Sequence, residues 1–114
     1  MSNFQQPEFI ATYWTHAGKV TPLGAPELEA SPHDFRARVE AAARAGYRGI
    51  GFMHSDLMSI RHRYTLAEMH SILNDSGLIH VELEFVVGWL EDGDALLACN
   101  EVMDDLLDAA TALD

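Results

Sequence analysis

Apolar residues recur along this chain at two spacings, one typical of strands and the other of helices. Residues 9–14 (FIATYW) are rich in aromatic and β-favouring side chains and follow Pro7, which predicts a first strand. Residues 47–53 (YRGIGFM) and 78–87 predict a second and a third strand. Alternation in the third strand is strict, so we expect its two faces to differ. The face toward the helices carries Ile79, Val81, Leu83 and Phe85, and the polar face carries His80, Glu82 and Glu84.

Between the first two strands the sequence predicts a long loop and then a helix. Residues 15–30 contain two glycines and two prolines, which argues against a regular element there. The helix starts at Ser31, whose hydroxyl suits a cap, with Pro32 in the first turn and Asp34 near the positive end of the dipole. Gly46 ends it, because glycine readily adopts the left-handed conformation of a helix terminus. The predicted buried face carries Phe35, Val39, Ala42 and Ala43.

Two further helices are predicted after the second and third strands. Thr65 and Glu68 form a capping box at the start of the first of these, and Gly77 ends it. Its apolar stripe consists of Leu66, Met69, Ile72 and Leu73. The last helix begins at Asp94, and its apolar stripe consists of Leu96, Cys99, Val102, Met103, Leu106, Ala110 and Leu113.

The order strand, helix, strand, helix, strand, helix requires a parallel sheet with right-handed crossovers, which is an α/β fold. A helix–glycine–strand unit occurs at Gly46 and again at Gly77, 31 residues later. A third such unit would continue beyond residue 114, so we interpret the sequence as an interrupted series of βα units. Residues 9–114 form its one domain, and residues 1–8 form an N-terminal tail.

The composition is that of a soluble globular domain, with 48% apolar and 22% charged residues in a chain of 114. No stretch has the length and apolarity of a membrane span, and residues 1–8 lack the features of a signal peptide. We therefore expect a cytoplasmic protein that does not contact a membrane. The single cysteine, Cys99, agrees with this expectation because it can form no internal disulfide.

Charge argues against a nucleic-acid partner, because a net charge of −11 repels phosphate backbones. Only Arg61, His62 and Arg63 form a basic cluster. That run is too small for a nucleic-acid interface. It would suit one phosphate group of a small substrate.

Candidate site residues lie where the predicted strands end, because the sites of parallel α/β folds form at the carboxyl ends of strands. His16 follows the first strand, His54 and Asp56 follow the second, and Glu84 lies on the third. Imidazoles and carboxylates that converge there suit a divalent metal or proton transfer at a carbon beside a carbonyl group.

Each candidate also has a simpler interpretation. Asp56 can merely orient a surface histidine or cap a turn, and Glu82 and Glu84 can be the solvated face of an isolated strand. Inside a barrel, the same face would be the lumen. Trp14 and Trp89 lie beside the same strand ends, but tryptophans are more often packing residues than ligand platforms.

Three segments carry a likeness to a known family. They are residues 39–51 (VEAAARAGYRGIG), 54–57 (HSDL) and 78–85 (LIHVELEF). Together they resemble the N-terminal part of the sugar-phosphate isomerase/epimerase family, the xylose-isomerase-like barrels. The similarity spans residues 9–113, and HVELEF with a following tryptophan is its most specific piece. It implies the first three units of a (β/α)8 TIM barrel, with all helices on one side of a sheet of order 1-2-3 and Glu82 and Glu84 on the other.

The resemblance also implies a function, namely isomerisation or epimerisation of a sugar or polyol with a divalent metal (Mn, Mg, Zn or Co) in the barrel mouth. His54 and Glu84 match catalytic positions of the family. The residues expected to bind substrate are Trp14, His16, Asp56 and Trp89. Gly51 and Phe52 stand where relatives often carry a glutamate, and the family's main metal ligands come from later strands.

Three hypotheses follow from the sequence. The first is an incomplete isomerase or epimerase that holds one wall of the pocket and is inactive alone. The second is a non-enzymatic α/β module that self-associates through the open edges of its first and third strands. The third is a small metal-binding protein that uses His54, Asp56 and Glu84.

Overall fold

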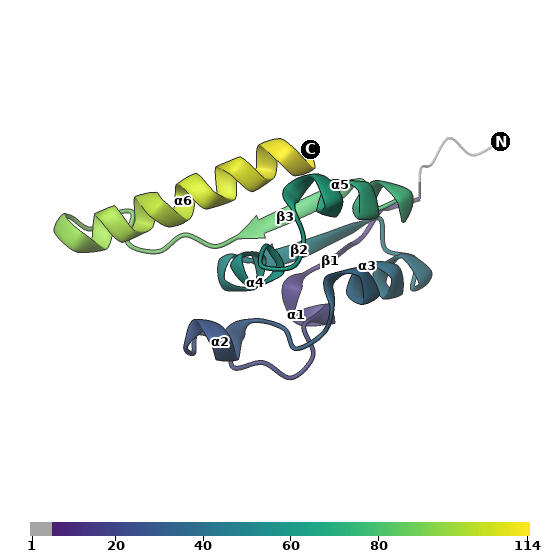
Figure 1. The fold of residues 1–114 in the computed structure, drawn as a ribbon, viewed down its shortest axis with the longest axis horizontal. Coiled ribbons are helices and arrows are strands. Elements are labelled where there is room, and N and C mark those ends of the chain that lie inside the picture. The colour runs from purple at the N-terminus through teal and green to yellow at the C-terminus, as the bar shows by residue number, and fades with distance from the viewer. Residues whose placement is uncertain (1–5) are drawn as a thin grey trace.

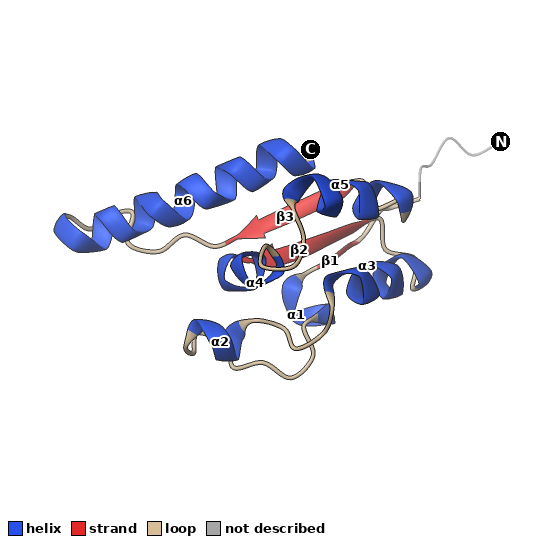
Figure 2. Cartoon of the chain, viewed as in Figure 1, coloured by secondary structure: helices blue, strands red, loops and turns tan. Residues whose placement is uncertain are grey.

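A three-stranded parallel sheet forms the centre of the molecule, in a computed structural model that describes residues 6–114 (Figures 1 and 2). Its strands are β1 (Ile10–Ala11), β2 (Gly49–Met53) and β3 (His80–Glu84), in the order β1-β2-β3. The predicted parallel α/β sheet and its strand order are confirmed. Of the predicted N-terminal tail, residues 1–5 lie outside the described residues, and residues 6–8 form no regular element.

Six helices connect and follow the strands in this part of the chain, and three of them are the predicted ones. These three are α3 (Phe35–Arg44), α5 (Leu66–Asp75) and α6 (Gly93–Leu113). The others are short: α1 (Tyr13–His16), α2 (Pro26–Glu29) and α4 (His54–Ile60). None of the helices in residues 6–114 combines the length and apolarity needed to cross a bilayer.

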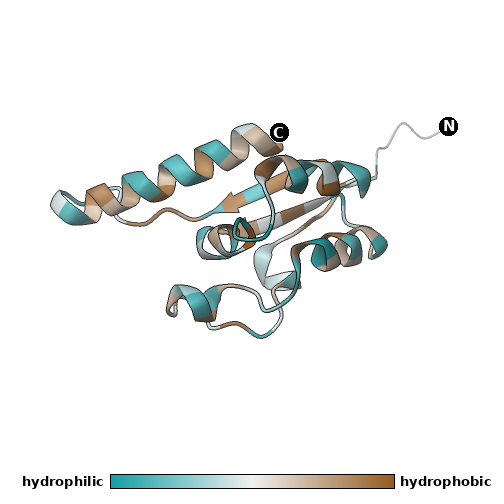
Figure 3. Cartoon of the chain, viewed as in Figure 1, coloured by the Kyte–Doolittle hydropathy of each residue, from teal (hydrophilic) through white to brown (hydrophobic). Residues whose placement is uncertain are grey.

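One face of the sheet is packed against helices α3 to α6. Ile50 is paired with Val81 and Phe52 with Leu83, and these four side chains belong to one apolar cluster. The cluster is completed by buried side chains of the four helices, and Figure 3 shows apolar segments on the strands and along the helices. The alternate residues of β2 and β3 point to the opposite face. Helices on one side, with Glu82 and Glu84 on the other, are therefore confirmed for these elements.

The helix boundaries predicted from glycines and from the capping box are confirmed. Gly46 and Gly77 have φ values of 99° and 76°, which place them in the left-handed region. Thr65 accepts a hydrogen bond from the Glu68 backbone, and the Glu68 side chain accepts one from the Thr65 backbone. These local signals depend on few neighbours, which explains their accuracy.

The first strand and the start of α3 differ from the prediction. The strand spans two residues instead of residues 9–14, because the chain turns into α1 at Tyr13, whose hydroxyl is buried against the Glu29 carbonyl. The predicted loop over 15–30 contains α2. The N-cap of α3 is Asp34 rather than Ser31, whose hydroxyl instead donates to the Ala17 carbonyl.

The end of β3 and the face of α6 also need correction. Phe85 lies beyond the end of β3 and is exposed, and Val86 packs against the core in its place. In α6, Ala109 is buried, whereas Ala110 is exposed. The covered side of α6 therefore runs through Cys99, Leu106, Ala109 and Leu113.

Candidate functional site

Glu82 and Glu84 lie on the face of the sheet opposite helices α3 to α6, which we call the uncovered face. Glu82 lies beside Gly51 of β2, where an added Cβ would be 3.0 Å from Glu82 Oε1. The glycine therefore leaves the room that the carboxylate occupies. Glu82 Oε1 is buried and has no hydrogen-bond partner within residues 6–114. A buried acceptor without a partner is costly, so this oxygen is a candidate for contact with a ligand.

Glu84 shares this face, two residues further along β3. Partial burial raises the pKa of its carboxyl above the usual 4.5, and the nearby Glu82 charge raises it further. A carboxyl with a raised pKa holds its proton nearer to neutral pH, which suits a group that donates and accepts protons.

His54 lies at the carboxyl end of β2, as predicted, but as the first residue of α4 rather than in a loop. Its Nε2 is 2.8 Å from Oδ2 of Asp105 on α6. The ring is therefore paired toward the helix layer and makes no hydrogen bond to Glu84. Sequence reasoning missed Asp105, because no motif marks it and it lies beside the apolar position Leu106.

Asp56 has an exposed fraction of 0% and forms an internal ion pair. Arg38 donates from Nη1 to Oδ2 at 2.9 Å and from Nη2 to Oδ1 at 3.2 Å. The backbone amide of Ser31 donates to Oδ1 at 3.0 Å. Both carboxylate oxygens thus have partners, and Asp56 holds α3 and α4 together; its role in substrate binding stays a prediction.

His16 is partly buried, and both of its ring nitrogens contact other residues of the protein. Its Nε2 lies 2.7 Å from the Gly51 carbonyl oxygen and its Nδ1 lies 3.4 Å from Nη1 of Arg38. The carbonyl can only accept and the guanidinium can only donate, so the ring carries its proton on Nε2. Burial is the main cause that lowers the pKa of His16, and the Arg38 charge acts in the same direction. The histidine ties α1 to β2 in its neutral form.

The two tryptophans are exposed and lie on separate elements. Trp14 is in α1, with 43% of its surface exposed and its ring edge against Tyr13. Trp89 follows β3 and is 64% exposed. Each remains available to a ligand or partner, and their substrate-binding role stays a prediction.

A metal site is not assembled by the described residues. Among residues 6–114, no group of three His, Cys, Asp or Glu side chains lies close enough to hold a metal ion. His54 is paired with Asp105, and Asp56 is paired with Arg38, so the predicted trio with Glu84 does not come together. The divalent metal implied by the resemblance would need ligands beyond those that these residues bring together.

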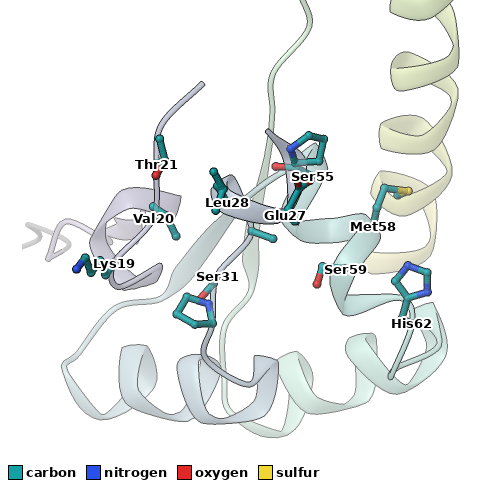
Figure 4. A pocket seen from close by; sticks show the side chains of 13 residues that line it. Lys19, Val20, Thr21, Glu27, Leu28, Ser31, Ser55, Met58, Ser59 and His62 are labelled. Atoms are coloured by element: carbon teal, nitrogen blue, oxygen red, sulfur yellow. The ribbon is translucent and has the colours of Figure 1, made fainter. Parts of the chain in front are cut away.

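A separate cavity of about 700 Å³ lies between residues 19–32 and α4 (Figure 4). Sequence reasoning did not find it, because its walls come from a segment that was expected to be an unstructured loop. The only signal was the basic run 61–63, whose His62 lines the cavity.

Comparisons of the chain with protein families, with curated proteins and with solved structures find no match.

Proposed function

We propose that this chain supplies one wall of an isomerase or epimerase site for a sugar or polyol, and that the uncovered face of its sheet is the lining of that site. The observation that carries the proposal is the Glu82–Glu84 pair on the face of the sheet opposite helices α3 to α6, where the one β2 side chain that is covered, Met53, packs against Tyr13 and Ala17. The partnerless oxygen of Glu82 and the raised pKa of Glu84 both mark this face as one that meets a ligand.

The fold supports this assignment through its one-sided packing. Parallel sheets are normally covered on both faces, and the main exception is a barrel, whose inner face encloses itself. A sheet of order β1-β2-β3 with α3, α5 and α6 on one face has the arrangement of successive units of such a barrel. The uncovered face would then be the lumen, and the resemblance of residues 78–85 to the isomerase/epimerase family agrees.

The chemistry proposed for Glu84 is proton transfer. Its carboxylate removes a proton from the carbon beside a substrate carbonyl, and the electron pair of that C–H bond moves to form an enediolate. Return of the proton to the neighbouring carbon gives the isomer, while the hydroxyl proton of that carbon passes to the former carbonyl oxygen. Epimerisation would need a second acid on the opposite side of the substrate, which another wall of the site would supply. Glu82 accepts a hydrogen bond from a substrate hydroxyl, which satisfies its buried oxygen.

The test uses the natural gene product that contains residues 1–114, at the length that an intact-mass measurement establishes. The protein is incubated in deuterium oxide with a panel of aldoses, ketoses and polyols, with and without manganese or magnesium, and exchange at carbon is followed by NMR. Glu84→Gln should slow exchange by about a hundredfold or more. Glu101→Gln, an exposed acid of α6, is the matched control. Exchange that Glu84→Gln leaves unchanged would contradict the proposal.

A second candidate function is an α/β module that self-associates. The observation that favours it is a groove of about 460 Å³ beside β3, lined mainly by apolar side chains of β3 and α6. Ile79 is 58% exposed there, and Leu107 is 56% exposed. An open strand edge next to exposed apolar side chains is a typical site of association.

A further inference from the structure

We propose that the cavity between residues 19–32 and α4 binds a small organic anion that has an apolar body. The inference is independent of the function proposed above, since no strand residue lines this cavity. Its volume of about 700 Å³ lies in the range of small-molecule sites.

The cavity wall is fixed by internal hydrogen bonds. Glu29 accepts from the Ser55 hydroxyl at 2.6 Å and from the Leu23 amide at 2.8 Å, which ties α2 to α4 and to the preceding loop. Ser31 donates from its hydroxyl to the Ala17 carbonyl at 2.7 Å. A wall that is already ordered loses little conformational entropy when a ligand binds.

Much of the lining surface is apolar, and this determines the body of the ligand. The apolar side chains that line the cavity are Val20, Pro26, Leu28, Ala30, Pro32 and Met58. Figure 4 shows Val20, Leu28 and Met58 on different sides of the space. An aromatic or aliphatic group placed between them would be removed from water, which is favourable in proportion to the apolar area buried.

The basic side chains of the cavity determine the polar group of the ligand. Lys19 and His62 line opposite ends of the cavity (Figure 4), and Arg61 and Arg63 flank His62 in the sequence. Of these arginines neither lines the cavity, and Arg63 lies 3.8 Å from Asp34, so Lys19 is the one Lys or Arg of the lining. Lys19 forms no ion pair within the described part of the chain. An anionic group of a ligand would form an ion pair with Lys19.

Ser59 provides a hydroxyl donor on the cavity wall between Lys19 and His62. Its hydroxyl lines the cavity and makes no hydrogen bond within residues 6–114, whereas the Ser55 hydroxyl is already used by Glu29. Glu27 is the one acidic side chain of the lining, so the cavity favours a ligand with a single anionic group over one with several. A phosphate monoester or a carboxylate on an apolar body meets these requirements.

The experiment titrates the full 114-residue chain with 1-naphthyl phosphate, using calorimetry and ¹⁵N-resolved NMR. Inorganic phosphate supplies the charge alone, 1-naphthol supplies the apolar body alone, and 1-naphthoate replaces the phosphate by a carboxylate. We expect saturable binding of naphthyl phosphate, with shifts confined to residues 19–32 and 55–62. Binding of both separate parts should be weaker. The stronger of naphthyl phosphate and naphthoate identifies which anion the site prefers.

The phosphate reaches only one end of the cavity, so one of the two variants Lys19→Met and His62→Gln should weaken binding of naphthyl phosphate by about tenfold, and the other should bind nearly like the parent. Ser59→Phe should abolish binding because it fills the cavity. Arg44→Met removes an exposed arginine of α3 that does not line the cavity, and it should bind like the parent. The far-ultraviolet circular dichroism of each variant verifies that it is folded. No saturable binding at millimolar concentration, or binding that all three cavity variants leave unchanged, would overturn the proposal.

Discussion

The two flanks of the sheet differ in how completely the chain packs them. On the flank of β1 and β2, Arg38 and Asp56 form a buried ion pair and His16 is locked between Arg38 and Gly51. On the flank of β3, Ile79 and other apolar side chains of the groove remain exposed. The two flanks therefore differ in kind: polar groups that pair with one another are buried on the flank of β1 and β2, whereas an apolar groove stays open on the flank of β3.

The flank of β1 and β2 depends on buried polar groups that form hydrogen bonds and an ion pair with one another. A buried carboxylate is tolerated only when opposite charge and hydrogen bonds replace its water. Asp56 meets this condition through three donors, two of them on Arg38. The β3 flank holds no comparable buried pair among the described residues, and several of the exposed side chains there are apolar, among them Ile79 and Leu107. Exposed apolar side chains of this kind are stabilised when another apolar surface covers them, and not by ion pairs among themselves.

The largest expected effect comes from breaking the buried ion pair. Asp56→Ala leaves the Arg38 charge buried without a partner, so we expect a loss of about 3–5 kcal/mol in the free energy of unfolding. Urea denaturation measures it. Replacing both residues together, with Asp56→Leu and Arg38→Met, should restore much of the stability because no unpaired charge remains. A loss below about 1 kcal/mol for Asp56→Ala would show that the pair is solvated in solution, in contrast with a buried pair.

The second prediction compares the same substitution on the two flanks. Leu57 is fully buried beneath β2, whereas Leu83 of β3 is only half-buried beside the groove. Leu57→Ala should cost about 2–5 kcal/mol, and Leu83→Ala only about 1–2 kcal/mol, because less apolar surface leaves water at Leu83. Urea denaturation of both variants tests the difference. Equal losses would mean that Leu83 is covered in solution, which self-association would explain.

The contrast also shows which features the sequence predicts. Strict alternation in residues 78–87 predicts the two faces of β3. Glycines predict the C-terminal ends of α3 and α5, and the capping box predicts the start of α5, because each signal depends on short-range geometry. The parallel order follows from the succession of elements. The first strand was predicted too long, because the residue that ends it, Tyr13, is held by distant Glu29.

The candidate site was predicted less well because its contacts also join residues that are distant in sequence. Glu82 and Glu84 were placed on the correct face by alternation alone. His54, Asp56 and His16 were selected by their position at strand ends, but their partners Asp105, Arg38 and Gly51 are distant in sequence. Position in the chain identifies which residues reach the rim, and only the packed structure decides which of them turn inward.

The third prediction concerns the exposed groove of the β3 flank. Leu107→Asn should weaken self-association of the chain by about tenfold, because it removes an exposed apolar side chain from the centre of the groove. Leu97→Asn is the matched control, since Leu97 is also exposed on α6 but does not line the groove. Sedimentation at several concentrations measures both. A parent chain that stays monomeric throughout would remove the association module as a candidate function.

The smallest expected effect is electrostatic and lies on the uncovered face. Because the pKa of Glu84 is raised in the folded protein, the folded state holds a proton there in a pH range where the unfolded state, with its pKa of 4.5, has released it. Stability therefore falls as the pH rises from 4.5 through the raised pKa, and the penalty persists at neutral pH. Glu84→Gln removes the ionisable group, so this variant should be slightly more stable than the parent at neutral pH.

The pH dependence of the stability difference between Glu84→Gln and the parent, measured with and without Glu82, separates the two causes of the raised Glu84 pKa. The stability advantage of Glu84→Gln should shrink as the pH falls through 4.5 and vanish below it, because the parent is then protonated at Glu84 in both the folded and the unfolded state. In a Glu82→Gln background, the advantage at neutral pH should be smaller, since the charge that is the lesser cause of the shift is gone. Urea denaturation from acidic to neutral pH measures all four proteins. If the parent and Glu84→Gln curves run parallel over this range, Glu84 is as solvated as an ordinary surface glutamate, and the uncovered face loses its main electrostatic distinction from the rest of the surface.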